Sequence, residues 1–129
     1  MSRMTKEELD EFIAEYTQDD RADKRYARVY FIREEGSGAI KIGMSTRVRD
    51  RFYMIQADNP NDITLLAQMF GGRRVEGVLH RYFESARIKG EWFRPKPELL
   101  AFIAALPNDC DARDVEELFE KRRKLRILA

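Results

Sequence analysis

The sequence predicts an α+β domain with a small, three-stranded antiparallel sheet flanked by helices. Two short apolar runs, VYFI and AIKIG, flank an EEGSG turn between residues 28 and 43, which is typical of a β-hairpin. A third apolar run, ITLLAQMF at residues 63–70, ends at a Gly-Gly pair. Segments between and after these runs carry apolar residues at helical spacing, so we expect helices to cover the sheet.

Further helices are expected at both ends of the chain. Thr5 followed by Glu8 is a capping-box start for an acidic helix over about residues 5–17. A short apolar helix is expected over residues 98–106, and a basic one from Asp114 onward. We therefore divide the chain into three parts: an N-terminal helical extension (1–26), a central domain (27–95) and a C-terminal helical extension (96–129).

The first two runs differ in their apolar pattern. Residues 29–32 are all large and apolar, which predicts a central strand covered on both faces. In the second run Ile40 and Ile42 share one face and leave Lys41 and Gly43 on the other. Pairing of Tyr30 with Lys41 would put both on one face, whereas pairing with Ile42 would send Lys41 to the opposite face.

Two helices are expected to bring charged residues to this hairpin. Ser45 is a suitable N-cap for a helix through about Ala57, with Arg51 at the border of its apolar stripe. A second helix should run from Arg73 to about Ser85, with Glu76 beside its stripe. The ARIKGEWFRPKP segment that follows is expected to be a loop or a short edge strand.

Composition limits the classes of function. The chain is 43% hydrophobic and 36% charged and lacks an apolar run of membrane-spanning length or a signal peptide, so we expect a soluble, cytoplasmic protein. The chain has one histidine and one cysteine, too few for a zinc finger and the bare minimum for a Cys-His protease. A metal would therefore need mainly oxygen ligands. The acidic start and basic end suit either nucleic-acid binding or pairing of the two ends.

Four side chains near the hairpin suit metal-dependent cleavage of a phosphodiester. Tyr30, with its pKa lowered by a nearby cation, would accept a proton from water; Lys41 would be that cation or itself a base. Arg51 would bind a phosphate oxygen, and Glu76 would hold a single Mg²⁺, for which Mn²⁺ is a possible substitute. Each also has an ordinary interpretation, as a core aromatic, an exposed strand residue, a solvated charge or an ion-pair partner.

The order VYF, KIG, arginine, glutamate and GEWF resembles the GIY-YIG nuclease superfamily, in particular a phage- and bacteria-associated subgroup whose signature runs from KIG to EWF. Tyr30 matches the tyrosine of the first triplet, and residues 41–43 match the second triplet with lysine replacing tyrosine. Arg51 and Glu76 match the helix arginine and the metal-binding glutamate. Arg28 stands where the superfamily has glycine. The resemblance implies an Mg²⁺-dependent endonuclease that acts on DNA.

Further residues are candidates for supporting roles. His80, one turn after Glu76, would touch substrate or polarise water, unless it is structural. Glu91 is expected to partner Arg51 or His80. The residues expected to contact DNA are Gly43, Ser45, Arg47, Arg74 and Trp92.

Two other functions remain open from the sequence. A catalytically inactive module with the same fold could bind nucleic acid or a protein. An interaction protein could form a homodimer through its acidic first helix and basic last helix, a contact that salt would weaken. We expect a monomer or a weak homodimer.

Overall fold

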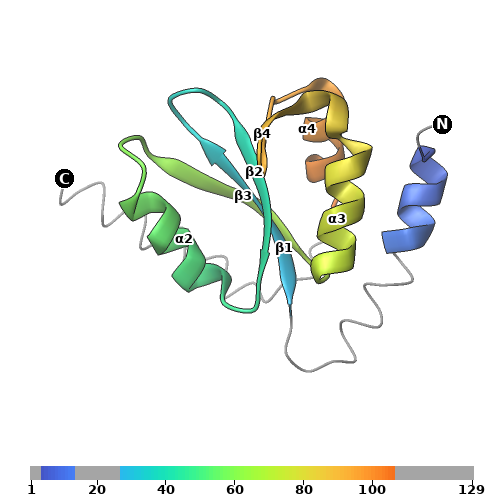
Figure 1. The fold of residues 1–129 in the computed structure, drawn as a ribbon, viewed down its shortest axis with the longest axis horizontal. Coiled ribbons are helices and arrows are strands. Elements are labelled where there is room, and N and C mark those ends of the chain that lie inside the picture. The colour runs from blue at the N-terminus through green and yellow to red at the C-terminus, as the bar shows by residue number, and fades with distance from the viewer. Residues whose placement is uncertain (1–3, 14–26, 107–129) are drawn as a thin grey trace.

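The structure is a computed structural model that describes residues 4–13 and 27–106. A five-stranded antiparallel sheet, in the order β3-β1-β2-β5-β4, has helices on both faces (Figure 1). Residues 6–13 are helical. The strands are β1 (Arg28–Glu34), β2 (Ile40–Ser45), β3 (Ile63–Phe70), β4 (Arg87–Lys89) and β5 (Trp92–Phe93); the helices are α2 (Val48–Ala57), α3 (Arg73–Tyr82) and α4 (Pro97–Ala104), with a 3-10 turn at Glu84–Ala86.

The predicted α+β class is confirmed, but the sheet has two strands more than predicted. All three expected strands form, and β3 has the predicted bounds. The additional strands β4 and β5 come from the segment expected to be a loop or edge strand, and β5 pairs with β2 through Ile40↔Phe93 and Lys41↔Trp92. Pro95 and Pro97 lie beyond β5 and therefore do not interrupt its pairing.

Strand β1 is central and buried on both faces, as predicted. It pairs with β2 on one side and β3 on the other, and none of residues 29–32 is more than 1% exposed. Val29 and Phe31 belong to the core that contains α3, α4 and Leu9, whereas Tyr30 and Ile32 belong to the core beneath α2. The sheet therefore separates two cores, and Tyr30 lies on the α2 face (Figure 1).

The structure confirms the predicted N-cap of the first helix but not the predicted N-cap of α2. The Thr5 hydroxyl accepts a hydrogen bond from the Glu8 N–H at 3.1 Å, so it caps the first helix as predicted. The prediction that Ser45 caps α2 is wrong, because Ser45 ends β2 and the N-cap is Arg47. The Ser45 hydroxyl instead accepts a hydrogen bond from the Arg47 N–H at 2.8 Å and shapes the turn between the two elements.

Helices α2 and α3 have 10 residues each and α4 has 8. Within the described part of the chain, no helix is long and apolar enough to cross a membrane. The expected helix from Asp114 onward, and the end of the first helix beyond residue 13, lie outside the described residues.

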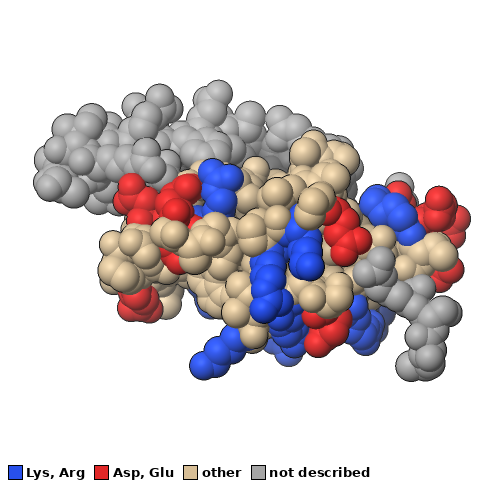
Figure 2. Space-filling view, turned by 90° about the horizontal axis from the view of Figure 1, so that it is seen from above, with Lys and Arg blue, Asp and Glu red and all other residues tan. Residues whose placement is uncertain are grey.

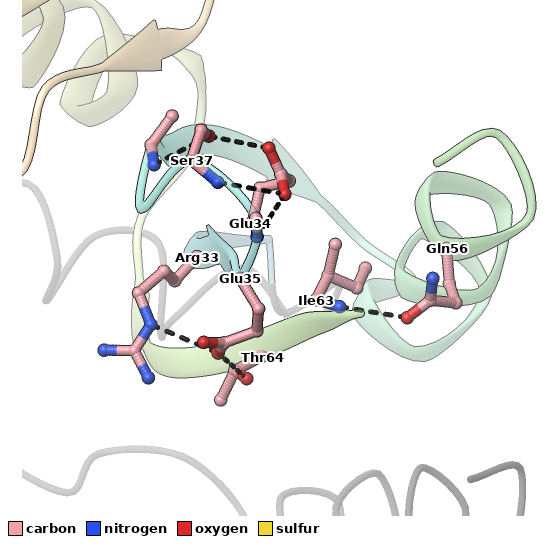
Figure 3. A network of polar contacts seen from close by, with 9 residues as sticks. Arg33, Glu34, Glu35, Ser37, Gln56, Ile63 and Thr64 are labelled. Carbon is pink, nitrogen blue, oxygen red and sulfur yellow. Dashed lines mark hydrogen bonds and ion pairs between the residues drawn. The ribbon is translucent and has the colours of Figure 1, made fainter. Parts of the chain in front are cut away.

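Polar contacts fix the turn end of the sheet (Figure 3). The Glu34 carboxylate accepts hydrogen bonds from the Ser37 hydroxyl at 2.6 Å and the Gly36 N–H at 2.5 Å, and these bonds, the Ser37 one first, lower the pKa of Glu34. On the neighbouring connection the Gln56 side-chain oxygen accepts a hydrogen bond from the Ile63 N–H at 3.0 Å. The β1–β2 turn is therefore held by its own side chains, and the end of α2 is tied to the start of β3.

Candidate active site

The strand register decides which side chains share the face of Tyr30. Tyr30 lies opposite Gly43 and Ile32 lies opposite Lys41, so neither of the two registers considered from the sequence occurs. Facing residues share a face, and so do residues two apart on one strand. Lys41 and Gly43 therefore lie on the α2 face with Tyr30, where the pairing of Tyr30 with Lys41 would also have placed Lys41.

The Tyr30 ring lies against the backbone of Gly43. A Cβ atom added to Gly43 would be 2.4 Å from the Tyr30 Oη and 2.5 Å from its Cζ. Both residues are buried, and Tyr30 is only 1% exposed. A glycine at this position is therefore what allows the ring to approach strand β2 so closely.

Charges from three other segments act on the Tyr30 hydroxyl. Burial and then the Glu91 carboxylate raise its pKa from 10.0 to about 12; Arg51 lowers it and Glu76 raises it, both to a smaller extent. The prediction that the pKa of Tyr30 is lowered is therefore wrong: Arg51 does lower it, but burial and the two carboxylates raise it by more. Tyr30 is a neutral hydroxyl at physiological pH.

Helix α3 brings Glu76 to this group along the edge of β2. The His80 Nε2 lies 2.8 Å from the carbonyl oxygen of Ile42. Because a carbonyl can only accept, Nε2 carries the hydrogen and donates. The His80 ring also packs on Phe93, with centroids 5.2 Å apart. His80 thus anchors α3 to β2 one turn after Glu76, and its proposed contact with substrate stays a prediction.

Glu76 is a partly buried carboxylate beside a second one. Burial and then Glu91 raise its pKa, while His80, Arg73 and Lys41 act in the opposite direction. Among the residues that the structure describes, the Glu76 carboxylate has no hydrogen bond or ion pair. A cation bound there would favour the ionised carboxylate and so offset the effects of burial and of Glu91, which raise its pKa.

The donor set near Glu76 suits a hard cation that retains water. Mg²⁺ is commonly held by one or two carboxylates together with waters and substrate phosphates. No cluster of three or more His, Cys, Asp or Glu side chains suited to a metal occurs in the described ranges. The described residues therefore do not form a complete protein cage for a metal, and Glu76 is the carboxylate that could contribute to a site completed by waters and substrate.

Lys41 and Glu91 form an ion pair beside Tyr30. The Lys41 Nζ lies 3.1 Å from the Glu91 Oε2 and 5.4 Å from the centroid of the Trp92 ring. The sequence predicts Arg51 or His80 as the partner of Glu91, but the structure has Lys41 instead. Glu91 was expected to have a supporting role, but the sequence did not reveal that its carboxylate acts on both Tyr30 and Glu76.

The missed signal was the short hairpin that carries Glu91. Gly90 has a φ of 57°, in the left-handed region that favours glycine, and it separates the runs RIK and WF. A glycine between two such runs is a hairpin signal. Recognising it would have predicted the β4–β5 hairpin with Glu91 in its turn, but the pairing of Trp92 with Lys41 depends on the register between β5 and β2.

Comparison with known proteins places the chain in a family. The T5orf172 domain matches residues 27–121, which is most of the chain. The chain belongs to the T5orf172 domain family. This phage-associated domain is often described as GIY-YIG-like and nuclease-related. No curated protein and no solved structure matches the chain.

The residues expected to contact DNA in this T5orf172 domain lie in separate places. Gly43 lies beneath Tyr30, and Arg74 is exposed near the start of α3. Arg47 lines a cavity of about 310 Å³ at the start of α2, together with Arg28 and Arg49. Figure 2 shows lysine and arginine side chains gathered in a band through the middle and lower part of one face, with acidic groups on both sides.

Substitution of Gly43 tests the packing of Tyr30. We expect Gly43→Ala to destabilise the protein by roughly 1–3 kcal/mol in urea unfolding, because the methyl group must displace a buried ring. The matched control is Gly77→Ala, where an added Cβ meets nothing within 4 Å. In the interior of α3 that change should stabilise by about 0.5–1 kcal/mol. Equal stability of wild type and Gly43→Ala would contradict the contact.

Neutralisation of Glu76 should stabilise the fold without metal. A raised carboxyl pKa means that ionisation costs stability as pH rises through that pKa. In EDTA we therefore expect Glu76→Gln to melt above wild type at about pH 8, and the difference to disappear below the ordinary value of 4.5. The exposed Glu84→Gln is the control. A wild type that melts above Glu76→Gln at about pH 8 would show that the carboxylate is not destabilising.

Proposed function

We propose that this T5orf172 protein is a metal-dependent endonuclease that hydrolyses DNA phosphodiester bonds. One observation carries the proposal: Arg51 from α2, Glu76 from α3 and Glu91 beside β5 all act on the hydroxyl of Tyr30. A titratable group whose pKa is shifted by burial and then by charges from several segments is typical of functional sites. Membership of a domain family described as nuclease-related supports a nucleic-acid substrate.

Glu76 is the residue that would hold Mg²⁺, with Mn²⁺ as a possible substitute. When bound, the ion would supply Lewis-acid stabilisation of charge on the phosphate oxygens. Glu76 is suited to this role because its carboxylate is partly buried and has no hydrogen bond or ion pair within the described residues.

Arg51 would bind the phosphate, and Tyr30 would act on the attacking water. Arg51 is exposed, so its guanidinium can bind two phosphate oxygens and offset charge in the transition state. Tyr30 is protonated at neutral pH, so its hydroxyl first orients the attacking water. Tyr30 could act as the base only as the tyrosinate, after its own proton has passed to solvent water, and this ionisation would become easier if the charges of Glu76 and Glu91 were offset.

Lys41 would support Tyr30 through Glu91. The ion pair at 3.1 Å places a positive charge on the carboxylate that contributes most, after burial, to the raised pKa of Tyr30. Lys41 is thus proposed to act on the tyrosine by neutralising Glu91, and its role as a free base is less favoured because its ammonium is engaged.

The rival function is a non-catalytic module that binds nucleic acid. The raised pKa of Tyr30 favours it, because such a tyrosine is a weak base in the free protein. The two functions differ in whether the purified protein cuts DNA.

Cleavage of supercoiled plasmid provides the test. We expect nicking with Mg²⁺ or Mn²⁺, none in EDTA, and rates at least about 100-fold lower for Glu76→Gln, Tyr30→Phe and Arg51→Ala. The control is Glu84→Gln, an exposed carboxylate that should leave the rate unchanged.

A gel-shift assay in EDTA separates loss of chemistry from loss of binding. Glu76→Gln should retain DNA binding, since its carboxylate is not expected to contact DNA without metal. If wild type binds DNA but cuts none with either metal, the endonuclease proposal is overturned in favour of the binding module. A full cleavage rate in Glu76→Gln would remove Glu76 from the mechanism.

A further inference from the structure

A second cavity, of about 450 Å³, lies where the β1–β2 turn meets the β4–β5 hairpin. Its lining combines the apolar surfaces of Trp92, Ile88 and Pro95 with the cationic side chains of Lys89 and Arg94. The rest of the wall is the Glu34 carboxylate, Ser37 and Ala39 from the β1–β2 connection and Asn59 from the α2–β3 connection; the Glu34 carboxylate is held by the Ser37 hydroxyl and the Gly36 N–H. Ile88 is 50% exposed, so its apolar surface is open to a ligand in the cavity.

We propose that this cavity binds a nucleobase of an unpaired nucleotide, stacked on Trp92. The proposal rests on the proposed function and names its substrate class as single-stranded nucleic acid. Stacking of bases on aromatic side chains beside a cationic groove is the common way in which proteins hold single strands. Lys89 and Arg94 supply the cations for the adjoining phosphates, and the polar wall offers partners for the edges of the base.

The sheet register connects this cavity to the candidate active site. Trp92 lies opposite Lys41 across the β2–β5 pair, so both lie on the α2 face with Tyr30. Lys41 is two residues, or about 7 Å, along β2 from Gly43, where the Tyr30 ring lies. A strand with its phosphate near Arg51 and Tyr30 can therefore place a neighbouring base in the cavity.

A duplex fits this arrangement less well than a single strand. The bases of a duplex are stacked and paired, and one reaches a side pocket only after it is flipped out, which costs a few kcal/mol. The cavity is lined by an indole ring and apolar neighbours, which suit the face of a base better than a phosphate backbone. We therefore expect single-stranded DNA to bind more tightly than duplex DNA.

Trp92 is the only tryptophan in the chain, so fluorescence excited selectively at tryptophan, beyond the absorption of the five tyrosines, reports on this cavity. The full chain carrying Glu76→Gln, in EDTA, is titrated with a short oligothymidine and with a duplex of equal length. We expect the single strand to quench the fluorescence and to bind about tenfold more tightly than the duplex. Equal quenching and equal affinity for the two DNAs would overturn the proposal.

Variants test the cavity by anisotropy of a labelled oligothymidine. Trp92→Ala should lose about tenfold in affinity, and Trp92→Phe should lose less because stacking is retained. Ile88→Glu, at an exposed position that should not affect folding, should also weaken binding. The control is Met54→Ala, a somewhat more exposed apolar residue on α2, which should bind as wild type.

Unchanged affinity in both Trp92→Ala and Ile88→Glu would overturn the base-binding cavity. These measurements involve no cleavage, so their result is independent of the plasmid assay. The cavity can be refuted while plasmid cleavage is observed, and it can be supported while none is observed. A nuclease that cuts plasmid but shows no single-strand preference would keep the proposed function and lose this inference.

Discussion

The contact between the Tyr30 ring and the backbone of Gly43 is the constraint on which the candidate site depends. It holds the ring across β2 and buries it, and burial is the largest cause of the raised pKa of its hydroxyl. Without a glycine at position 43 the ring could not lie so close to β2. The glycine of the KIG triplet therefore has a physical role in this protein: it makes room for the tyrosine.

The candidate site lies at the edge of β2, where elements from both faces of the sheet meet. Tyr30 and Lys41 lie on the α2 face, whereas Glu76 comes from α3, which packs on the other face (Figure 1). The hydrogen bond from His80 to the Ile42 carbonyl holds α3 against this edge. Burial and the neighbouring carboxylate make Glu76 unfavourable when ionised, a local cost that binding of a cation would relieve.

Much of the fold could be predicted because its signals are periodic. The four successive apolar residues of β1 indicated a central strand, and the apolar stripe of α3 placed that helix on the core. The start of α2 was misplaced because Ser45, a good cap by type, pairs with Arg28 as the last residue of β2. Strands β4 and β5 have three and two residues, too few for alternation to show.

The site was harder to predict than the fold because it depends on contacts between distant segments. Resemblance to a family named Tyr30, Arg51 and Glu76 as a group, and the charges of Arg51 and Glu76 do act on the Tyr30 hydroxyl. The direction of the pKa shift at Tyr30 could not be foreseen, since it sums burial with charges from three other segments. The pairing of Lys41 with Glu91 followed from a strand that the sequence pattern did not reveal.

The proposed activity depends on a divalent cation bound at Glu76, whose charge acts on the Tyr30 hydroxyl. Titration of the ¹⁵N-labelled protein with Mn²⁺ tests it most directly, because the paramagnetic ion broadens the amide signals of nearby residues. We predict that the signals of Gly43, Glu76 and His80 broaden first in wild type and remain sharp in Glu76→Gln. Broadening that begins instead at the carboxylates of the β1–β2 turn, Glu34 and Glu35, and is unaffected by Glu76→Gln would contradict the account.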